Sequence, residues 1–304
     1  MIGGGVSVCR GLPGRTGLEG CMPTVRLAGV NDEPSPTWDL DEGLDVLEEL
    51  GIRFVELRAA YDKMVDAMDD DEFTRVADRI IERGFQVTTY LGQMGQCVVD
   101  EAGCAQDLFK VKRAVERTDY LGARQIRLMG YKKGKEDGTD WKRKAMDQFQ
   151  AMTDVAAAGD KVMIFENPPN LTSAICRAHE CREVLDRVQS PHLRHNLDPG
   201  NFGSHGEVGV GLYETLKEYV VNVHVKDIRV PDDKSTYCPA GEGICCYPEI
   251  LGAMAADGFD GIVTVEPHMT HTIAHHTTGR KNFIEATEKL IRLLEESGFE
   301  VQKA

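Results

Sequence analysis

The sequence lacks any apolar run that approaches the roughly 20 residues of a membrane span. Its first two dozen residues also lack the continuous apolar core of a signal peptide, because they are rich in glycine and are broken by Pro13 and Pro23. No membrane partner is therefore expected. We expect residues 1–22 to form a short flexible arm in front of one domain that spans residues 23–304.

Positive charge is scarce in this chain. Lysine and arginine together number 35 against 50 aspartates and glutamates, which gives a net charge of −15. A nucleic-acid partner is not expected, since binding to phosphates requires a basic surface. A small neutral substrate fits this composition, and so does an anionic substrate held by a few local arginines or lysines. Adaptation of an acidic surface to salt is an alternative explanation of the charge.

The sequence also lacks closely paired cysteines. Its nine cysteines are scattered, and no two of them form a CxxC pair. Cys245 and Cys246 are adjacent and cannot easily bridge each other. A structural zinc site or a disulfide framework is therefore not expected, and the composition favours a reduced, cytoplasmic protein.

Short runs of β-branched residues alternate along the chain with amphipathic segments of helical period. Glycines such as Gly51, Gly84 and Gly122 follow the helical segments, as C-cap residues do. Strands are expected at residues 24–30, 54–58, 85–91, 124–129, 162–166, 193–198, 220–225 and 262–266. Helices are expected at residues 41–50, 73–81, 105–121, 141–158, 174–188, 213–219, 248–256 and 283–294.

This alternation implies a parallel sheet, and eight strand–helix units fit a closed barrel better than an open sheet. A doubly wound sheet that binds a dinucleotide would carry a glycine-rich phosphate turn after an early strand, and the sequence has none there. The predicted fold class is α/β, a single (β/α)8 TIM barrel behind the flexible N-terminal arm.

Each of the four strands in the second half of the chain carries one polar side chain at or near its C-terminal end. These side chains are Glu166, Asp198, His224 and Glu266. The C-terminal ends of the strands form the active face of such a barrel, so the four should point into one cavity. Oxygen-rich ligation with a single imidazole suits Mn²⁺, Mg²⁺ or Co²⁺ better than an ion that prefers thiolates. Taken singly, each carboxylate could equally be a solvated loop charge.

These stretches resemble the xylose isomerase-like TIM barrels, which include sugar phosphate isomerases and epimerases, inosose dehydratases and endonuclease IV. The resemblance covers residues 24–297 and is carried by Glu-Asn-Pro at Glu166, Asp-Pro-Gly-Asn at Asp198, Val-His-Val-Lys-Asp around His224, Pro-Ala-Gly-Glu-Gly ending at Gly243, and Gly-Phe-Asp-Gly-Ile-Val-Thr-Val-Glu ending at Glu266. It implies that Glu166, Asp198, His224 and Glu266 bind one divalent ion. Manganese is expected first, with magnesium, cobalt and zinc as alternatives.

The resemblance also implies a reaction. A ketose or keto-sugar, with or without a phosphate, would be isomerised or epimerised by proton transfer through a metal-stabilised enediolate. Glu166 and Glu266 would be the catalytic pair, one taking a proton and the other returning one. The alternative is that both glutamates are purely ligands. The expected partner is therefore a small sugar or sugar phosphate, and assembly into a homo-oligomer is left open.

Further candidate residues surround this set. Asn201, Lys226 and Arg229 are expected to bind substrate; Asn201 stands where several relatives have histidine, and Arg229 is offset by about one residue from a substrate-binding arginine of some epimerases. For several other side chains the sequence does not decide between a structural and a functional role. Glu56 and Arg58 either pair structurally or reach the pocket, and the structural role is favoured. Tyr131 and Lys132 follow the fourth strand, and a histidine-rich tract follows the eighth strand at His271, His275 and His276.

Three other functions compete with a sugar isomerase or epimerase. A dehydratase or lyase acting on a keto-polyol or keto-sugar would use the same metal and expel a β-hydroxyl. A phosphodiesterase similar to endonuclease IV would need further histidine and acidic ligands and a basic face. A non-catalytic barrel that binds sugar would not need four intact ligands.

Overall fold

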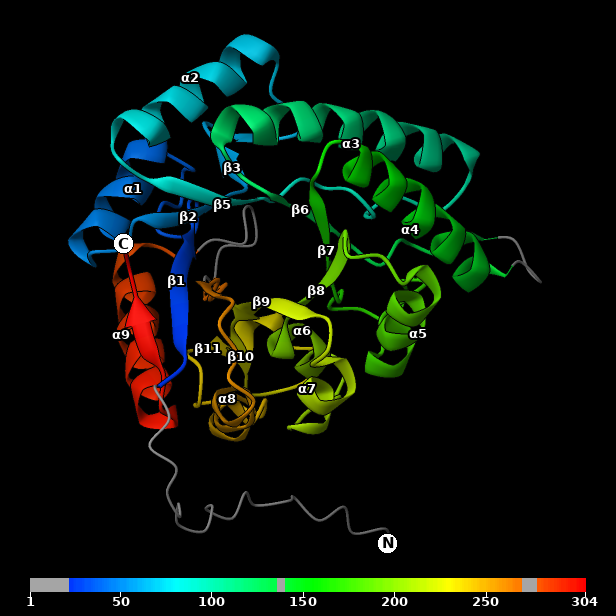
Figure 1. Ribbon diagram of the computed structural model, residues 1–304. Coiled ribbons are helices and arrows are strands. Elements are labelled where there is room, and N and C mark those ends of the chain that lie inside the picture. The colour runs from blue at the N-terminus through cyan, green and yellow to red at the C-terminus, as the bar shows by residue number, and fades with distance from the viewer. Residues whose placement is uncertain (1–21, 136–139, 270–277) are drawn as a thin grey trace, which may run out of the picture.

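The computed structural model describes residues 22–135, 140–269 and 278–304 (Figure 1). Within these ranges, eight parallel strands close into a barrel: β1 (Thr24–Val30), β2 (Phe54–Leu57), β5 (Gln86–Tyr90), β6 (Gln125–Leu128), β7 (Val162–Glu166), β8 (Leu193–Leu197), β9 (Val220–Val225) and β12 (Ile262–Val265). Closure comes from the pairing of β12 with β1, in which Arg26 lies opposite Ile262. The predicted α/β TIM barrel is confirmed.

An outer layer of helices covers the strands (Figure 1). Its members are α1 (Leu40–Glu49), α2 (Asp70–Glu82), α3 (Glu101–Leu121), α4 (Trp141–Ala158), α5 (Ala178–Val188), α7 (Gly211–Leu216), α8 (Tyr247–Ala256) and α9 (Arg280–Ser297). Helix α2 shows how the sequence specifies them. It begins with a capping box between Asp69 and Glu72, and it buries one apolar stripe that includes Phe73 and Ile80. The main hydrophobic core therefore lies between the strands and these helices.

Most of the predicted helices begin or end at different residues in the structure, and three of them are examples. The helix predicted at residues 105–121 begins at Glu101, because the Asp100 side chain caps it. The helix predicted at residues 174–188 begins at Ala178, since the Ala174 N–H instead donates to the Tyr131 carbonyl of a neighbouring loop. The helix predicted at residues 213–219 spans Gly211–Leu216.

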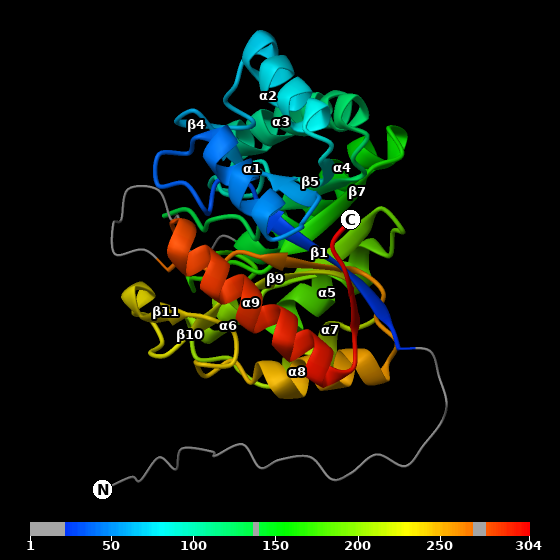
Figure 2. The same ribbon diagram turned by 90° about the vertical axis from the view of Figure 1, so that its left-hand side faces the viewer.

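Several short elements were not predicted, because two to five residues carry no periodic signal. Strand β13 (Glu300–Gln302) extends the sheet by pairing with the first residues of β1. Short pairings join β3 (Ala59–Ala60) to β4 (Lys63–Met64) and β10 (Asp227–Ile228) to β11 (Tyr237–Cys238), and η1 (Lys234–Thr236) and α6 (Pro199–Gly203) are single turns. Figure 2 shows β10 and β11 at one end of the barrel and the start of β1 at the opposite end.

Residues 1–21 of the arm, together with His271, His275 and His276, lie outside the described residues. Among the helices that are described, none combines the length and apolar character needed to cross a membrane.

Candidate metal centre

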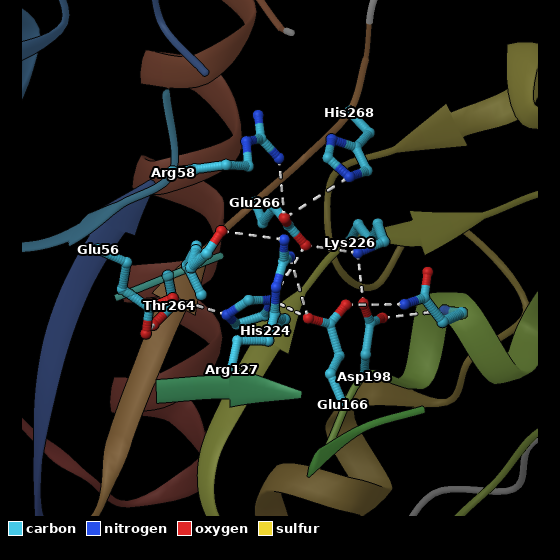
Figure 3. A network of polar contacts seen from close by, with 12 residues as sticks. Glu56, Arg58, Arg127, Glu166, Asp198, His224, Lys226, Thr264, Glu266 and His268 are labelled. Atoms are coloured by element: carbon cyan, nitrogen blue, oxygen red, sulfur yellow. Dashed lines mark hydrogen bonds and ion pairs between the residues drawn. The ribbon is translucent and has the colours of Figure 1, made fainter. Parts of the chain in front are cut away.

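The structure brings the four predicted ligands together at the C-terminal ends of the strands (Figure 3). Glu166 is the last residue of β7, Asp198 and Glu266 directly follow β8 and β12, and His224 lies near the end of β9. Each of the four is at most 3 % exposed, and one ligand atom from each lies within 4.8 Å of the others.

The donor set of this cluster suits a hard or borderline divalent ion, because it consists of three carboxylates and one imidazole. Placing these carboxylates together in the protein interior is electrostatically costly. Burial, together with the nearby Glu166 and Glu266, raises the pKa of Asp198 to about 6 against the lowering effect of Lys226. A cation among the four side chains would relieve this cost, so the residues present fit a metal ion.

Buried charge around the cluster is also unbalanced toward the negative. Among the described residues, six buried carboxylates belong to this network, and three arginine or lysine side chains contact them: Asp32, Glu33, Glu56, Glu166, Asp198 and Glu266 against Arg58, Arg127 and Lys226. His224 and His268 add positive charge only when protonated. With both histidines neutral, as His224 would be when it binds a metal, the deficit is three charges, and a divalent cation would remove most of it.

The imidazole of His224 is oriented by Glu56. Its Nε2 lies 2.7 Å from Glu56 Oε2, whereas its Nδ1 faces Glu266 Oε2 at 3.1 Å and Glu166 Oε2 at 3.5 Å. Burial alone would lower the pKa of His224, but Glu266, Glu56 and Glu166 raise it well above its ordinary value. The Glu56 contact keeps a proton on Nε2 and leaves Nδ1 as the nitrogen available to a metal.

Glu56 is itself held by a set of hydrogen-bond donors inside the barrel. Its Oε1 accepts from Asn222 Nδ2 at 2.6 Å, from Thr264 Oγ1 at 2.9 Å and from Thr89 Oγ1 at 3.1 Å. Strands β2, β5, β9 and β12 therefore contribute to a fixed carboxylate directly beneath His224. Polar residues, rather than apolar packing, therefore support the candidate metal centre from below.

The two glutamates of the candidate centre have different partners. Glu166 Oε2 lies 3.3 Å from Arg127 Nη1, and Glu166 Oε1 accepts from Asn201 Nδ2 at 3.0 Å. Arg127 is fixed in turn by the backbone carbonyls of Leu91 and Gly92. Arg127 of β6 and Asn201 of α6, which follows β8, therefore hold the Glu166 carboxylate from the sides of the two strands that flank β7.

Glu266 sits among cations. Its Oε1 lies 3.0 Å from Arg58 Nη1, and its Oε2 lies 2.7 Å from Lys226 Nζ. Burial would raise the pKa of Glu266, but Lys226, His224 and His268 hold it well below its ordinary value. Lys226 also donates to Asp198, so one ammonium bridges two of the candidate ligands.

Above these residues opens a cavity of about 570 Å³. Its floor includes Glu166, Glu266, Asn201, Lys226 and the guanidinium groups of Arg58 and Arg127. Further side chains line its walls and rim, namely Trp38, Met64, Gln93, Gln96, Met129, Lys132, Pro168, Pro169, Asn170, Ser173, Lys234, Tyr237 and His268. The cavity has the size of a typical small-molecule site.

The predicted substrate-binding residues divide into two groups. Asn201 and Lys226 line the cavity, and each contacts a candidate ligand. Arg229 is half exposed, pairs with Glu242 at 2.7 Å, and does not belong to the cavity lining. The contact of Arg229 with substrate stays a prediction, and the surface position of its side chain does not support it.

Glu56 and Arg58 contact different partners rather than each other, and Arg58 reaches the cavity, which was the alternative to a structural pairing. Side chains two residues apart in an extended segment share a face, but Glu56 lies within β2 and Arg58 follows its end, and the two residues join different networks. Glu56 contacts His224 inside the barrel, whereas the Arg58 guanidinium binds Asp32, Glu33 and Glu266.

Sequence reasoning missed Arg127, Asp32, Glu33 and His268. Arg127 had a usable signal, because a charged residue between Ile126 and Leu128 of a buried strand must face the barrel interior. His268 Nδ1 lies 2.7 Å from Glu33 Oε1, and these two residues are 235 positions apart in the chain. No local pattern predicts such a contact.

Known structures with this architecture include proteins of different activities. An IOLI protein with a bound zinc atom is 15% identical to this chain, with a TM-score of 0.74, covering 89% of this chain and 98% of the other. A D-tagatose 3-epimerase-like protein is 12% identical, with a TM-score of 0.73 and coverages of 89% and 97%. The probable 3-DHS dehydratase AsbF of Bacillus anthracis is 15% identical, with a TM-score of 0.67 and coverages of 88% and 98%.

At these identities the similarity shows the fold alone. No curated protein sequence matches the chain. A family model described as "Xylose isomerase-like TIM barrel" matches residues 44–297, a range that contains all four residues of the candidate metal centre. The chain therefore belongs to the xylose isomerase-like TIM barrel family.

Proposed function

We propose that this protein is a divalent-metal-dependent sugar isomerase or epimerase that acts on a ketose or keto-sugar by proton transfer. The observation that carries the proposal is the meeting of Glu166 and Glu266 at one cavity floor. They come from β7 and β12, which β8 and β9 separate in the barrel, so they approach the cavity from different sides. A substrate between them would present each glutamate with a different face.

Glu166, Asp198, His224 and Glu266 would hold one ion, with Mn²⁺ as the first candidate and Mg²⁺, Co²⁺ and Zn²⁺ as alternatives. When bound, the ion supplies Lewis-acid polarisation of the substrate carbonyl and stabilises the enediolate. The IOLI structure holds zinc, and this supports a metal in the same fold.

The chain's own residues would move the proton and hold the substrate. One of Glu166 and Glu266 removes the proton next to the carbonyl, and the other returns a proton to the product. Arg127 and Asn201 fix the orientation of Glu166, while Arg58 and Lys226 fix that of Glu266. Lys226 and Asn201 also line the cavity, where they can donate hydrogen bonds to substrate oxygens.

The test is a panel of ketoses, keto-polyols and sugar phosphates with the metal-loaded protein. Chelation should abolish turnover, and Mn²⁺ or Co²⁺ should restore it. Full activity in protein shown to be metal-free by elemental analysis would contradict the proposal.

A dehydratase acting on a keto-polyol or keto-sugar is the second candidate. It is favoured by the Lys226 ammonium, which lies on the cavity floor and could protonate a departing hydroxyl, and by the structural similarity to a probable dehydratase. A product that lacks one hydroxyl group would establish this alternative. A small sugar or sugar phosphate is the proposed partner in either case, and both the homo-oligomer and the cytoplasmic location stay predictions.

A further inference from the structure

Lys132 lies on the rim of the cavity, four residues after the end of β6. Its side chain is exposed and lines the cavity. Throughout residues 22–135, 140–269 and 278–304, no carboxylate forms an ion pair with Lys132. An unpaired cation at the entrance of a cavity is noteworthy in a chain whose net charge is −15.

The backbone of Lys132 is fixed between two loops. Its N–H donates to the Cys97 carbonyl at 2.8 Å, and its own carbonyl accepts from the Val99 N–H at 3.2 Å. On the other side, the Ala174 N–H donates to the Tyr131 carbonyl at 2.8 Å. Tyr131 has a φ of 56°, in the left-handed region that bulky residues seldom adopt. The loops after β5 and β7 thus hold the segment in place while the Lys132 ammonium stays available.

Neutral hydrogen-bonding groups lie on the same wall. Ser173 forms a β-bridge with Lys132, and both line the cavity together with Asn170 and Gln96. The Oδ1 of Asn170 accepts from the Ser173 hydroxyl at 3.3 Å, which directs the amide NH₂ of Asn170 elsewhere. Among the described residues, this NH₂ has no hydrogen-bond partner. The wall therefore offers one cation and further donors.

The cations of the cavity fall into two classes. Those on the floor, namely Arg58, Arg127 and Lys226, contact buried carboxylates. Those on the rim, Lys132 and Lys234, have no such partner among the described residues. The floor cations are needed to balance the metal centre, whereas the rim cations are left to attract a ligand of opposite charge.

We propose that the substrate carries an anionic group, a phosphate or a carboxylate, at the end remote from its reacting carbonyl, and that Lys132 pairs with that group. This inference rests on the proposed function, because it takes the cavity as the substrate site. It narrows the substrate from sugars in general to sugar phosphates or sugar acids.

The experiment compares the Mn²⁺-loaded protein with Lys132→Met, which keeps the aliphatic stem and removes the charge. Lys133→Met is the matched control, since Lys133 is the exposed neighbour that does not line the cavity. The first measurement is kcat/KM for a neutral ketose, its terminal phosphate and the corresponding keto-acid sugar. Loss of one charge-assisted hydrogen bond should lower the ratio of anionic to neutral kcat/KM by about 10- to 100-fold in Lys132→Met only. Whether the phosphate or the carboxylate shows the larger loss identifies the anion.

The second measurement is calorimetric titration with inorganic phosphate and with acetate, which needs no turnover. Either anion can also coordinate the metal, but this contribution is the same in the parent and both variants. The quantity compared is therefore the difference in anion affinity between the three proteins. Weaker binding by Lys132→Met than by Lys133→Met supports the inference, even if no sugar is turned over and the proposed function fails. Equal anion affinities together with an unchanged substrate ratio would overturn it.

Discussion

Removing the negative charge of Glu56 should weaken metal binding although Glu56 is not itself a candidate ligand. Its Oε2 holds His224 Nε2 at 2.7 Å, and its Oε1 accepts from three donors. A glutamine at this position cannot accept hydrogen bonds both from His224 and from the three donors. With its oxygen toward His224, its NH₂ group faces the donors of Asn222, Thr264 and Thr89.

With its NH₂ group toward His224, glutamine instead requires Nε2 to accept a hydrogen bond. The imidazole proton then moves to Nδ1, the nitrogen that faces Glu166 and Glu266. Either arrangement costs metal affinity. Loss of such a supporting carboxylate typically weakens metal binding by about 10- to 100-fold, which is about 1.4–2.7 kcal/mol.

The assay is competitive titration of Mn²⁺ against a chromophoric chelator at constant pH. Thr89→Val is the control within the same network, because it removes one donor to Glu56 and leaves the contact between Glu56 and His224. We expect Thr89→Val to change affinity by less than about threefold. If Glu56→Gln folds normally and binds Mn²⁺ within twofold of the parent, the reasoning about His224 is refuted.

Two further predictions concern the ligands and a buried histidine. Asp198→Ala and His224→Ala should each lose metal and should no longer melt at a higher temperature when Mn²⁺ is added, as thermal scans with and without the ion will show; equal metal content in variant and parent removes that residue from the ligand set. Burial lowers the pKa of His195 to about 3. Below pH 6.5 the unfolded chain therefore binds a proton at this imidazole that the folded chain does not bind. The free energy of unfolding consequently decreases as the pH falls below 6.5. The decrease amounts to about 2 kcal/mol between pH 8 and pH 5. His195→Leu should lack this decrease in urea unfolding, since neither ring nitrogen has a side-chain partner among the described residues. The same pH dependence in variant and parent would contradict the prediction.

Much of the barrel was predictable from the sequence, because the signals that specify it are local. Runs such as Val162–Glu166 and Ile262–Val265 are short, apolar and β-branched, and helices with one apolar stripe separate them. The order of strands around a parallel barrel then follows the order of the chain. The meeting of Glu166, Asp198, His224 and Glu266 required only that polar residues at strand ends share one face.

What the sequence did not predict depends on contacts between distant segments. Glu56 and His224 are 168 positions apart, and Arg58 and Glu266 are 208 positions apart. The side chains of Glu56 and Arg58 find their partners on distant segments, at His224 and Glu33, so their closeness in the sequence does not predict these contacts. Arg229 illustrates the same limit, since it points to Glu242 on the surface rather than into the cavity.

Solvent isotope incorporation tests the central claim most directly, namely that Glu166 and Glu266 transfer protons. A carboxylate that has taken a proton exchanges it with water, so turnover in D₂O should place deuterium on the carbon next to the carbonyl. Glu166→Gln and Glu266→Gln, compared at matched Mn²⁺ occupancy, should each suppress this exchange by at least about 100-fold while substrate binding changes far less. Product without solvent deuterium, in which the original hydrogen is found on the neighbouring carbon, would show hydride transfer and would contradict the proposed mechanism.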